Sequence, residues 1–345
     1  MRYSETNINT PSPGGEKEVN VGNLSRRQFL RRTVLASAAG AAVLSGMPNR
    51  AQASAKPMAT VIDLSKCDGC AGLAVPQCVA SCKNKNQSQF PQPKKPIQDY
   101  WPRKGYEDWS DKQQITNRLT PYNWLYVQPI TVNGRQISIP RRCMHCENPP
   151  CAKICPFSAY TIHGDSSVVV DHDVCFGGAK CRDVCPWGVP SRQAGVGLYM
   201  KLAPTYGGGG VMYKCDMCHD LVTKRQQPAC VAACPKQAMT FGPKSDMKQL
   251  AEKRRQEIGG FIYGLKENGG TATYYVSPVS FDDIDKALHA QGIVDGKPGR
   301  AGMPAVSSKM EEFDTLAAAM LVAPVAGMFA AGRAALRSMK QDDKE

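Results

Sequence analysis

Segments with a regular alternation of apolar and polar residues are short and widely spaced along this chain of 345 residues. Side chains at residues 60–64 alternate in character, which predicts a strand. Two runs of β-prone residues surround a Gly-Asp-Ser-Ser turn within residues 160–171, which predicts a hairpin. These patterns favour short elements separated by long irregular stretches.

The pattern after residue 245 is more regular. Residues 246–258 form a charged amphipathic repeat and predict a helix capped by Ser245 or Asp246. A strand is expected at residues 271–276 and a short helix at residues 282–288. The chain is therefore expected to be α+β, with residues 246–313 forming a C-terminal extension.

Residues 84–128 break every regular pattern. This stretch is polar and holds five prolines and three tryptophans. Prolines at this density exclude a regular helix or central strand. We interpret the stretch as an insertion that is either an ordered loop over the core or an aromatic surface for a partner.

The N-terminal residues carry an export pattern. A Ser-Arg-Arg-Gln-Phe-Leu-Arg run at residues 25–31 is followed by a mildly apolar run and by Ala51-Gln52-Ala53. This order is typical of a twin-arginine signal peptide, by which folded proteins are exported. Residues 1–53 are predicted to be a disordered N-terminus and signal peptide, and the mature chain is predicted to begin near Ser54.

A second apolar run lies near the C-terminus. Residues 316–332 are seventeen residues without a charge, about 26 Å of helix against a hydrocarbon core of about 30 Å. Basic residues follow the run and acidic residues precede it, so the C-terminus is predicted to be cytoplasmic. We expect a transmembrane anchor at residues 314–336 and a cytoplasmic tail at residues 337–345. A buried helix packed on a partner is the alternative.

Cysteines supply the candidate chemistry, because fifteen of them fall into four groups. Three groups begin with C-x2-C and all four end with C-x3-C, three of them followed by proline. The four groups are Cys67, Cys70, Cys78 and Cys82; Cys143, Cys146, Cys151 and Cys155; Cys175, Cys181 and Cys185; and Cys215, Cys218, Cys230 and Cys234.

The third group departs from the iron–sulfur run C-x2-C-x2-C-x3-C-P at one position. Gly178 stands where the second cysteine belongs, while Cys175, Cys181, Cys185 and Pro186 are in register. With one ligand missing, this group predicts a [3Fe–4S] cluster. A [4Fe–4S] cluster with water or another residue as the fourth ligand, and an empty site, are the alternatives.

Three other uses of the cysteines fit the count less well. Disulfides would leave one cysteine over, and structural zinc would not explain the C-x3-C-P endings. The run Cys215-Asp216-Met217-Cys218-His219 matches a c-type haem attachment signal, but that use would strand Cys230 and Cys234. His219 is therefore interpreted as a neighbour of a cluster and not as an axial ligand.

The charge of the chain changes meaning once clusters are considered. The formal net charge is +13, which alone would suggest an anionic partner. Four clusters with thiolate ligands would carry roughly −8 in total, so nucleic-acid binding is not expected. Several basic residues are expected to lie against the clusters: Lys66, Arg141, Arg142, Lys180, Arg182 and Lys214.

No catalytic constellation is recognisable in the sequence, so we predict a non-catalytic electron-transfer protein. The order of the four groups, with the segments C-M-H-C-E-N-P-P-C at 143–151 and C-P-W-G-V-P at 185–190, resembles the four-cluster ferredoxin-like subunits of membrane-bound oxidoreductases. The N- and C-terminal features resemble most the iron–sulfur subunits of periplasmic nickel–iron hydrogenases, which are related to the beta subunits of molybdopterin oxidoreductases.

The resemblance implies tandem ferredoxin-like dicluster modules over residues 54–245, with the insertion at 84–128. It implies three [4Fe–4S] clusters and one [3Fe–4S] cluster, with ligands exchanged between the groups. The first set would be Cys67, Cys70, Cys78 and Cys234; the second Cys215, Cys218, Cys230 and Cys82; the third Cys143, Cys146, Cys151 and Cys185; and the three-iron set Cys175, Cys181 and Cys155.

The expected role is electron relay between a periplasmic hydrogenase-like catalytic subunit and an integral membrane subunit that reacts with quinone or carries haem. The chain would lie on the periplasmic face of the inner membrane. The alternatives are a beta subunit of a molybdopterin oxidoreductase and a stand-alone cluster-bearing redox sensor or anchor.

Overall fold

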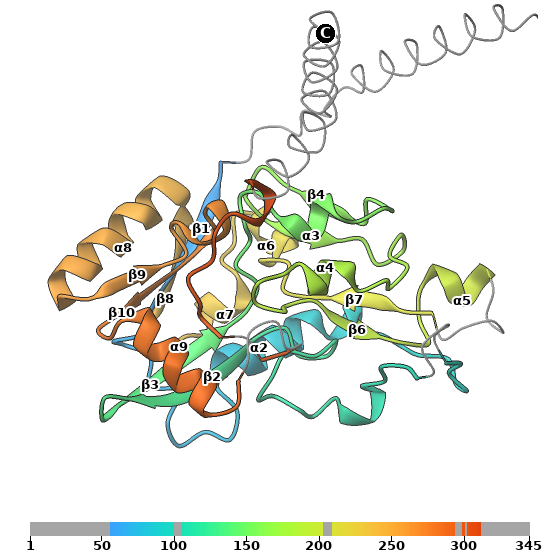
Figure 1. Cartoon of the computed structure of the whole chain (residues 1–345), viewed down its shortest axis with the longest axis horizontal. Coiled ribbons are helices and arrows are strands. Elements are labelled where there is room, and N and C mark those ends of the chain that lie inside the picture. Colours follow the sequence, from blue (N-terminus) through green and yellow to red (C-terminus); the bar gives the residue numbers. More distant parts are fainter. Residues whose placement is uncertain (1–55, 100–104, 203–208, 294–298, 301, 312–345) are drawn as a thin grey trace, which may run out of the picture. The chain divides into compact units, whose positions relative to one another are not determined.

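The main sheet joins strands from the beginning and the end of the described chain. The computed structural model describes residues 56–99, 105–202, 209–293, 299–300 and 302–311. Its four-stranded sheet has the order β8-β1-β10-β9, with β1 and β10 parallel and the outer pairs antiparallel (Figure 1). The strands are β1 (Met58–Asp63), β8 (Met239–Pro243), β9 (Phe261–Tyr263) and β10 (Thr273–Ser277). Both predicted strands are confirmed, as β1 and β10.

Helix α8 (Lys244–Ile258) covers one face of this sheet (Figure 1). Because successive side chains of a strand point to opposite faces, Val61 and Tyr274 pack with Ala251 of α8, whereas Ile62 and Tyr275 belong to the cluster that holds the cysteines. The helix is confirmed, but its predicted cap is wrong. Pro243 occupies the N-cap position and no side chain caps the helix, because β8 runs directly into it.

Three two-stranded hairpins accompany the main sheet. The hairpin predicted within residues 160–171 is confirmed, and two others were not predicted. Their strands pair antiparallel as β2 (Tyr126–Val132) with β3 (Arg135–Arg141), β4 (Tyr160–Ile162) with β5 (Val168–Val170), and β6 (Ser191–Gln193) with β7 (Val211–Tyr213).

The remaining helices are short, and several carry cysteines. Helix α2 contacts α7, and α3 contacts α4. The predicted helix at residues 282–288 is confirmed as α9, which contacts β2 and begins with Ser280 accepting a hydrogen bond from Asp283 N at 3.1 Å. These helices are α2 (Gln77–Asn86), α3 (Pro150–Lys153), α4 (Lys180–Asp183), α5 (Leu198–Leu202), α6 (His219–Val222), α7 (Ala229–Ala232) and α9 (Phe281–Ala290).

Regular elements extend into the stretch 84–128 at both of its ends. Helix α2 continues to Asn86 and β2 already begins at Tyr126. Between them, Glu107 bridges Arg182 at 2.7 Å and Arg192 at 2.7 Å. This interpretation as an ordered loop is supported, since Glu107 ties the insertion to the third cysteine group.

Two predictions fall on residues that the structure does not describe. The signal peptide at residues 1–53 and the transmembrane anchor at residues 314–336 both lie outside the described ranges. Among the helices that are described, none has the length and apolar character needed to cross a membrane.

Candidate cofactor site

The helix pairs bring distant cysteine groups together. Cys78 and Cys82 lie on α2, which packs against α7 with Cys230, and Cys234 follows one turn later. Cys151 of α3 and Cys181 of α4 are related in the same way, with Cys155 and Cys185 following. The first group is thereby joined to the fourth and the second to the third.

Two cavities are each lined by four cysteines drawn from two groups. Cys67, Cys70 and Cys78 share a cavity with Cys234, and we call this set site 1. The set that we call site 3 is Cys143, Cys146, Cys151 and Cys185, which line a second cavity with Trp187 and Lys214.

The other seven cysteines form two more sets. Burial, followed by the nearby thiolates of Cys215, Cys230 and Cys218, raises the pKa of Cys82 well above its ordinary value. We call these four residues site 2. Burial, together with Cys175 and Cys155, likewise raises the pKa of Cys181 to about 11, and we call these three residues site 4.

The four sites adjoin one another in series. Burial is the main cause of the raised pKa of Cys78 in site 1, and the Cys230 thiolate of site 2 adds to it. In the same way Cys143 of site 3 acts on Cys215 of site 2, and Cys181 of site 4 acts on Cys185 of site 3. The thiols of site 1 therefore lie near those of site 2, those of site 2 near those of site 3, and those of site 3 near those of site 4.

The loops of the C-x2-C pairs share a tight turn that aims backbone N–H groups at sulfur. Met217 N donates to Cys215 Sγ at 3.4 Å, and Met217 has a φ of 60° in the left-handed region. Gly177 N donates to Cys175 Sγ at the same 3.4 Å, with a φ of 66°. The third group therefore keeps the N–H to sulfur contact of the fourth, and in sequence Gly178 stands where Cys218 stands. The backbone differs at that position, because Cys218 has a φ of 52° whereas Gly178 does not lie in the left-handed region.

The position of Gly178 is open. The residue is exposed, and a Cβ atom built on it would meet no other atom within 4 Å. A cysteine side chain is therefore missing here because of the sequence and not because neighbouring residues exclude it.

The residues of these sites fit iron–sulfur clusters. Burial, with neighbouring thiolates, raises the pKa of Cys67 to about 11 and that of Cys218 to about 12, so the thiolate forms need a cationic partner. Soft thiolates with hydrogen bonds to sulfur are the donors that such clusters prefer. Among the described residues, no three or more His, Cys, Asp or Glu side chains are close enough together to hold a single metal ion. A cluster is larger than one ion, and the cavities of sites 1 and 3 each present four separate thiols around such a space.

His219 is oriented by a carboxylate and by a second histidine. Its Nδ1 lies 2.6 Å from Asp165 Oδ2, and its ring stacks on His163 with centroids 3.7 Å apart. Cys215 and Cys218 of the same run belong to site 2 with Cys230. His219 directly follows Cys218, and its interpretation as a neighbour of a cluster stays a prediction.

Only some of the basic residues expected at the clusters lie there. Arg142 and Lys214 are buried beside Cys215, whereas Lys66 and Lys180 are exposed. Arg141 is buried but donates to Gly302 O at 2.6 Å, and Arg182 pairs with Glu107. The imidazole of His145 also contacts Cys215. This contact was not predicted, because the sequence of a C-x2-C loop does not indicate toward which cysteine group its histidine points.

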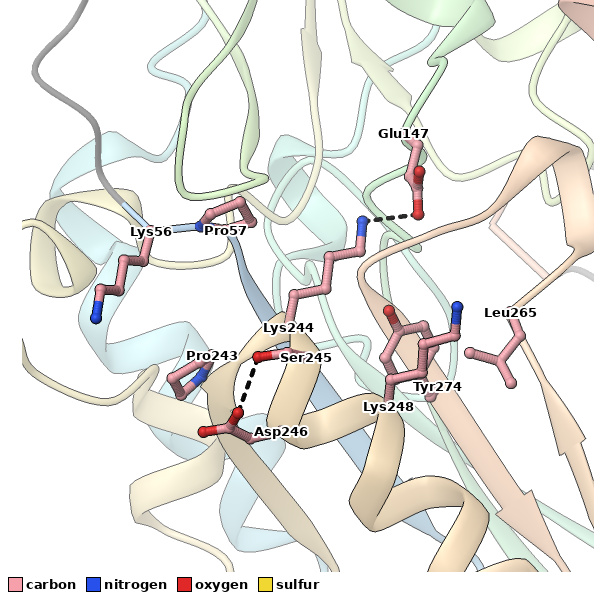
Figure 2. A pocket seen from close by; sticks show the side chains of 10 residues that line it. All are labelled: Lys56, Pro57, Glu147, Pro243, Lys244, Ser245, Asp246, Lys248, Leu265 and Tyr274. Carbon is pink, nitrogen blue, oxygen red and sulfur yellow. Dashed lines mark hydrogen bonds and ion pairs between the residues drawn. The ribbon is translucent and has the colours of Figure 1, made fainter.

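A larger hollow lies apart from the cysteines. About 600 Å³ of space opens at the start of α8 between Lys56, Lys248 and Tyr274 (Figure 2). Lys244 crosses it to Glu147 at 2.8 Å, and Ser245 donates to Asp246 at 2.8 Å. None of the cysteines lines this hollow, and the Lys244–Glu147 ion pair ties the start of α8 to the loop after Cys146.

Comparison with known families agrees with this geometry. Residues 66–159 and residues 135–244 each match a 4Fe-4S dicluster domain. The two matches together cover all four cysteine groups, and each covers less than half of the chain.

Curated relatives are subunits of oxidoreductases or products of their operons. The sulfite dehydrogenase B subunit of Allochromatium vinosum is 32% identical over 64% of this chain and 82% of its own length. The hydrogenase-2 operon protein HybA of Escherichia coli O157:H7 is 27% identical over 76% and 83%. The probable anaerobic dimethyl sulfoxide reductase chain YnfG of Escherichia coli K12 is 39% identical over 31% and 46%.

The extent of these matches varies. The chain spans less than two thirds of some relatives, 65% of one from Nitratidesulfovibrio vulgaris and 46% of YnfG. The sulfite dehydrogenase protein is matched over most of its length, and both domain matches fall on the cysteine sites. The chain therefore belongs to the 4Fe-4S dicluster family of iron–sulfur electron-transfer subunits of oxidoreductases.

Proposed function

We propose that this chain relays electrons through three [4Fe–4S] clusters and one [3Fe–4S] cluster, held by its fifteen cysteines. The observation that carries the proposal is the series of four adjoining thiol sites. When bound, the clusters supply reversible one-electron redox chemistry. Sites 1, 2 and 3 each offer four thiols, and site 4 offers three.

The three-iron assignment belongs to site 4. Cys155, Cys175 and Cys181 are its thiols, and the exposed Gly178 leaves the fourth position without a ligand side chain. The same open position would also admit water as a fourth ligand, so iron content and spin state decide between the two.

The chain itself is proposed to be non-catalytic. The eight cysteines of sites 1 and 3 line two small cavities, and the hollow at α8 is lined by a lysine–glutamate ion pair and prolines. Catalysis would then belong to a partner subunit.

We propose a hydrogenase-like catalytic partner and an integral membrane partner that reacts with quinone or carries haem. The similarity to a hydrogenase-2 operon protein over 83% of its length supports this choice. The periplasmic location, the twin-arginine export route and the membrane anchor are proposed from residues 1–53 and 314–336, outside the described ranges.

A second candidate has its own support. The similarity to a sulfite dehydrogenase subunit, at 32% identity over 82% of that protein, favours a beta-type subunit of another oxidoreductase, such as a molybdopterin enzyme. Both candidates require the same relay and differ in the catalytic partner.

The experiment is anaerobic purification of the full chain with whatever subunits accompany it. About fifteen irons per chain, a near-isotropic signal of one oxidised three-iron centre in electron paramagnetic resonance, and reversible reduction would support the relay. About twelve irons without that signal would mean an empty site 4 and would overturn the four-cluster row. The co-purifying catalytic subunit distinguishes the two candidates.

A further inference from the structure

Site 2 is the most deeply buried of the four thiol sites. All of its cysteines are buried, whereas every other site includes at least one cysteine of intermediate exposure. A buried site disfavours added negative charge, because the protein interior screens charge less well than water. Reduction at site 2 therefore needs compensation from nearby groups.

Two buried cations lie beside this site, and one of them, Lys214, also lines the cavity of site 3. Arg142 is 3% exposed, and its Nη1 lies 4.0 Å from Cys215 Sγ. Its Nη2 donates to Thr273 Oγ1 at 3.3 Å, while the buried Nε has no hydrogen-bond partner in the described protein. Lys214 is 4% exposed and donates to Cys215 O at 3.0 Å and to Val168 O.

A neutral histidine completes the arrangement. The N–H of Val168 donates to Nδ1 of His145 at 3.1 Å, so this nitrogen carries no proton. The other nitrogen, Nε2, then carries the proton and lies 3.6 Å from Cys215 Sγ. His145 is 1% exposed and therefore donates a fixed hydrogen bond to the same thiolate that Arg142 approaches.

The surrounding carboxylate does not cancel these charges. Asp216 lies next to Cys215, but it shares Lys85 with Asp220, at 3.4 Å and 2.6 Å. Site 1 differs, because its nearby charges, Asp68 and Lys236, are partly exposed and pair with each other at 3.5 Å. Arg142 and Lys214, in contrast, are buried beside Cys215 and form no ion pair with a carboxylate among the described residues.

We propose that Arg142, His145 and Lys214 set the reduction potential of the cluster in site 2. Their positive charge and hydrogen bonding offset the cost of adding an electron to a buried site, so that sites 1 and 3 can exchange electrons with it. This inference rests on the proposed relay. Arg142 and His145 act on the thiolate of Cys215, by charge and by hydrogen bonding. Lys214 donates to the backbone oxygen of Cys215 and acts by its charge, both on site 2 and on site 3, whose cavity it lines. The step itself is the transfer of one electron between adjoining sites.

The test is a redox titration of the full chain, followed by electron paramagnetic resonance, for Lys214→Gln against the matched control Lys236→Gln. Both lysines lie within two residues of a site cysteine, but Lys236 is 58% exposed. We expect Lys214→Gln to lower the equilibrium constant for reduction of one cluster at least tenfold, which is 59 mV for one electron. The control should change it less than threefold, and Lys214→Arg should restore it.

A fully loaded Lys214→Gln protein with unchanged potentials would overturn the proposal. If that variant loses about four irons while Lys214→Arg keeps them, buried charge is needed even to hold the cluster, which supports it. Loss of those irons in both variants would show a purely structural position and overturn it. Failure of the relay is distinguishable, because the wild-type chain would then lack iron or reversible reduction.

Discussion

The open position at Gly178 allows a sharp test of the three-iron site. In Gly178→Cys the new Cβ meets no atom within 4 Å, and Gly178 does not have a left-handed φ, so the substitution introduces neither a clash nor backbone strain. Replacing glycine at such a position stabilises a fold by about 0.4–1 kcal/mol through the unfolded chain. The new thiol would complete the C-x2-C-x2-C-x3-C-P run.

The expected result is a change in metal content and magnetism together. Iron should rise from about fifteen to about sixteen per chain, and the signal of the oxidised three-iron centre should fall from about one spin per chain to none. Quantitative iron analysis and electron paramagnetic resonance of the anaerobically purified protein measure both.

The neighbouring glycine provides the matched control. Gly177 has a φ of 66°, and a Cβ atom there would lie 2.5 Å from Gly210 O, so Gly177→Cys should lose stability and leave site 4 unconverted. A Gly178→Cys protein that folds, contains the new thiol and still shows the full three-iron signal would refute our placement of this residue at the missing ligand.

Three further predictions concern the protein around the sites. Glu107→Gln removes the shared partner of Arg182 and Arg192 and should cost about 2 kcal/mol, less than a fully buried pair because all three are partly exposed; calorimetry should show a melting temperature lower by roughly 4–8 °C. Burial alone would raise the pKa of Glu107, but the two arginines lower this pKa overall. The stabilisation by the Glu107 carboxylate is therefore complete above the ordinary glutamate pKa and is lost as pH falls through the lowered pKa of Glu107. A stability difference between wild type and variant that persists in strong acid would contradict this assignment. Trp187→Phe removes the 2.8 Å hydrogen bond to Tyr263 and should cost about 1–2 kcal/mol in chemical denaturation, whereas an unchanged midpoint would exclude that role. Anaerobic removal of iron by a chelator should abolish cooperative unfolding, because six cysteines belong to the main core; retention of the wild-type transition without iron would show that the core does not depend on the clusters.

Local patterns predicted the elements whose neighbours lie close in sequence. Strand β1, the β4–β5 hairpin and α9 follow directly from alternation, turn residues and helical spacing. The β2–β3 hairpin was missed because Pro129 and Pro140 lie within its strands. A two-stranded ribbon tolerates proline, since many of its backbone N–H groups have no second strand to bond.

Long-range pairs could not be predicted in the same way. The cysteine spacing indicated four sites and the vacancy at Gly178. It gave no information on Glu107, which meets Arg182 and Arg192 across 75 and 85 residues. The imidazole of His145 meets Cys215 across 70 residues, so its contact depends on the assembled fold.

The nested order of the exchanged helix pairs bears on how the protein is made. Sites 3 and 4 draw all their thiols from residues 143–185, so both can close once that stretch has left the ribosome. Sites 1 and 2 begin at Cys67 and Cys82 but need Cys234 and Cys230, which leaves their first thiols waiting through most of synthesis. The inner pair of sites therefore has all its thiols once residue 185 is made, while the outer pair must wait for Cys234, with 111 of the 345 residues still to follow.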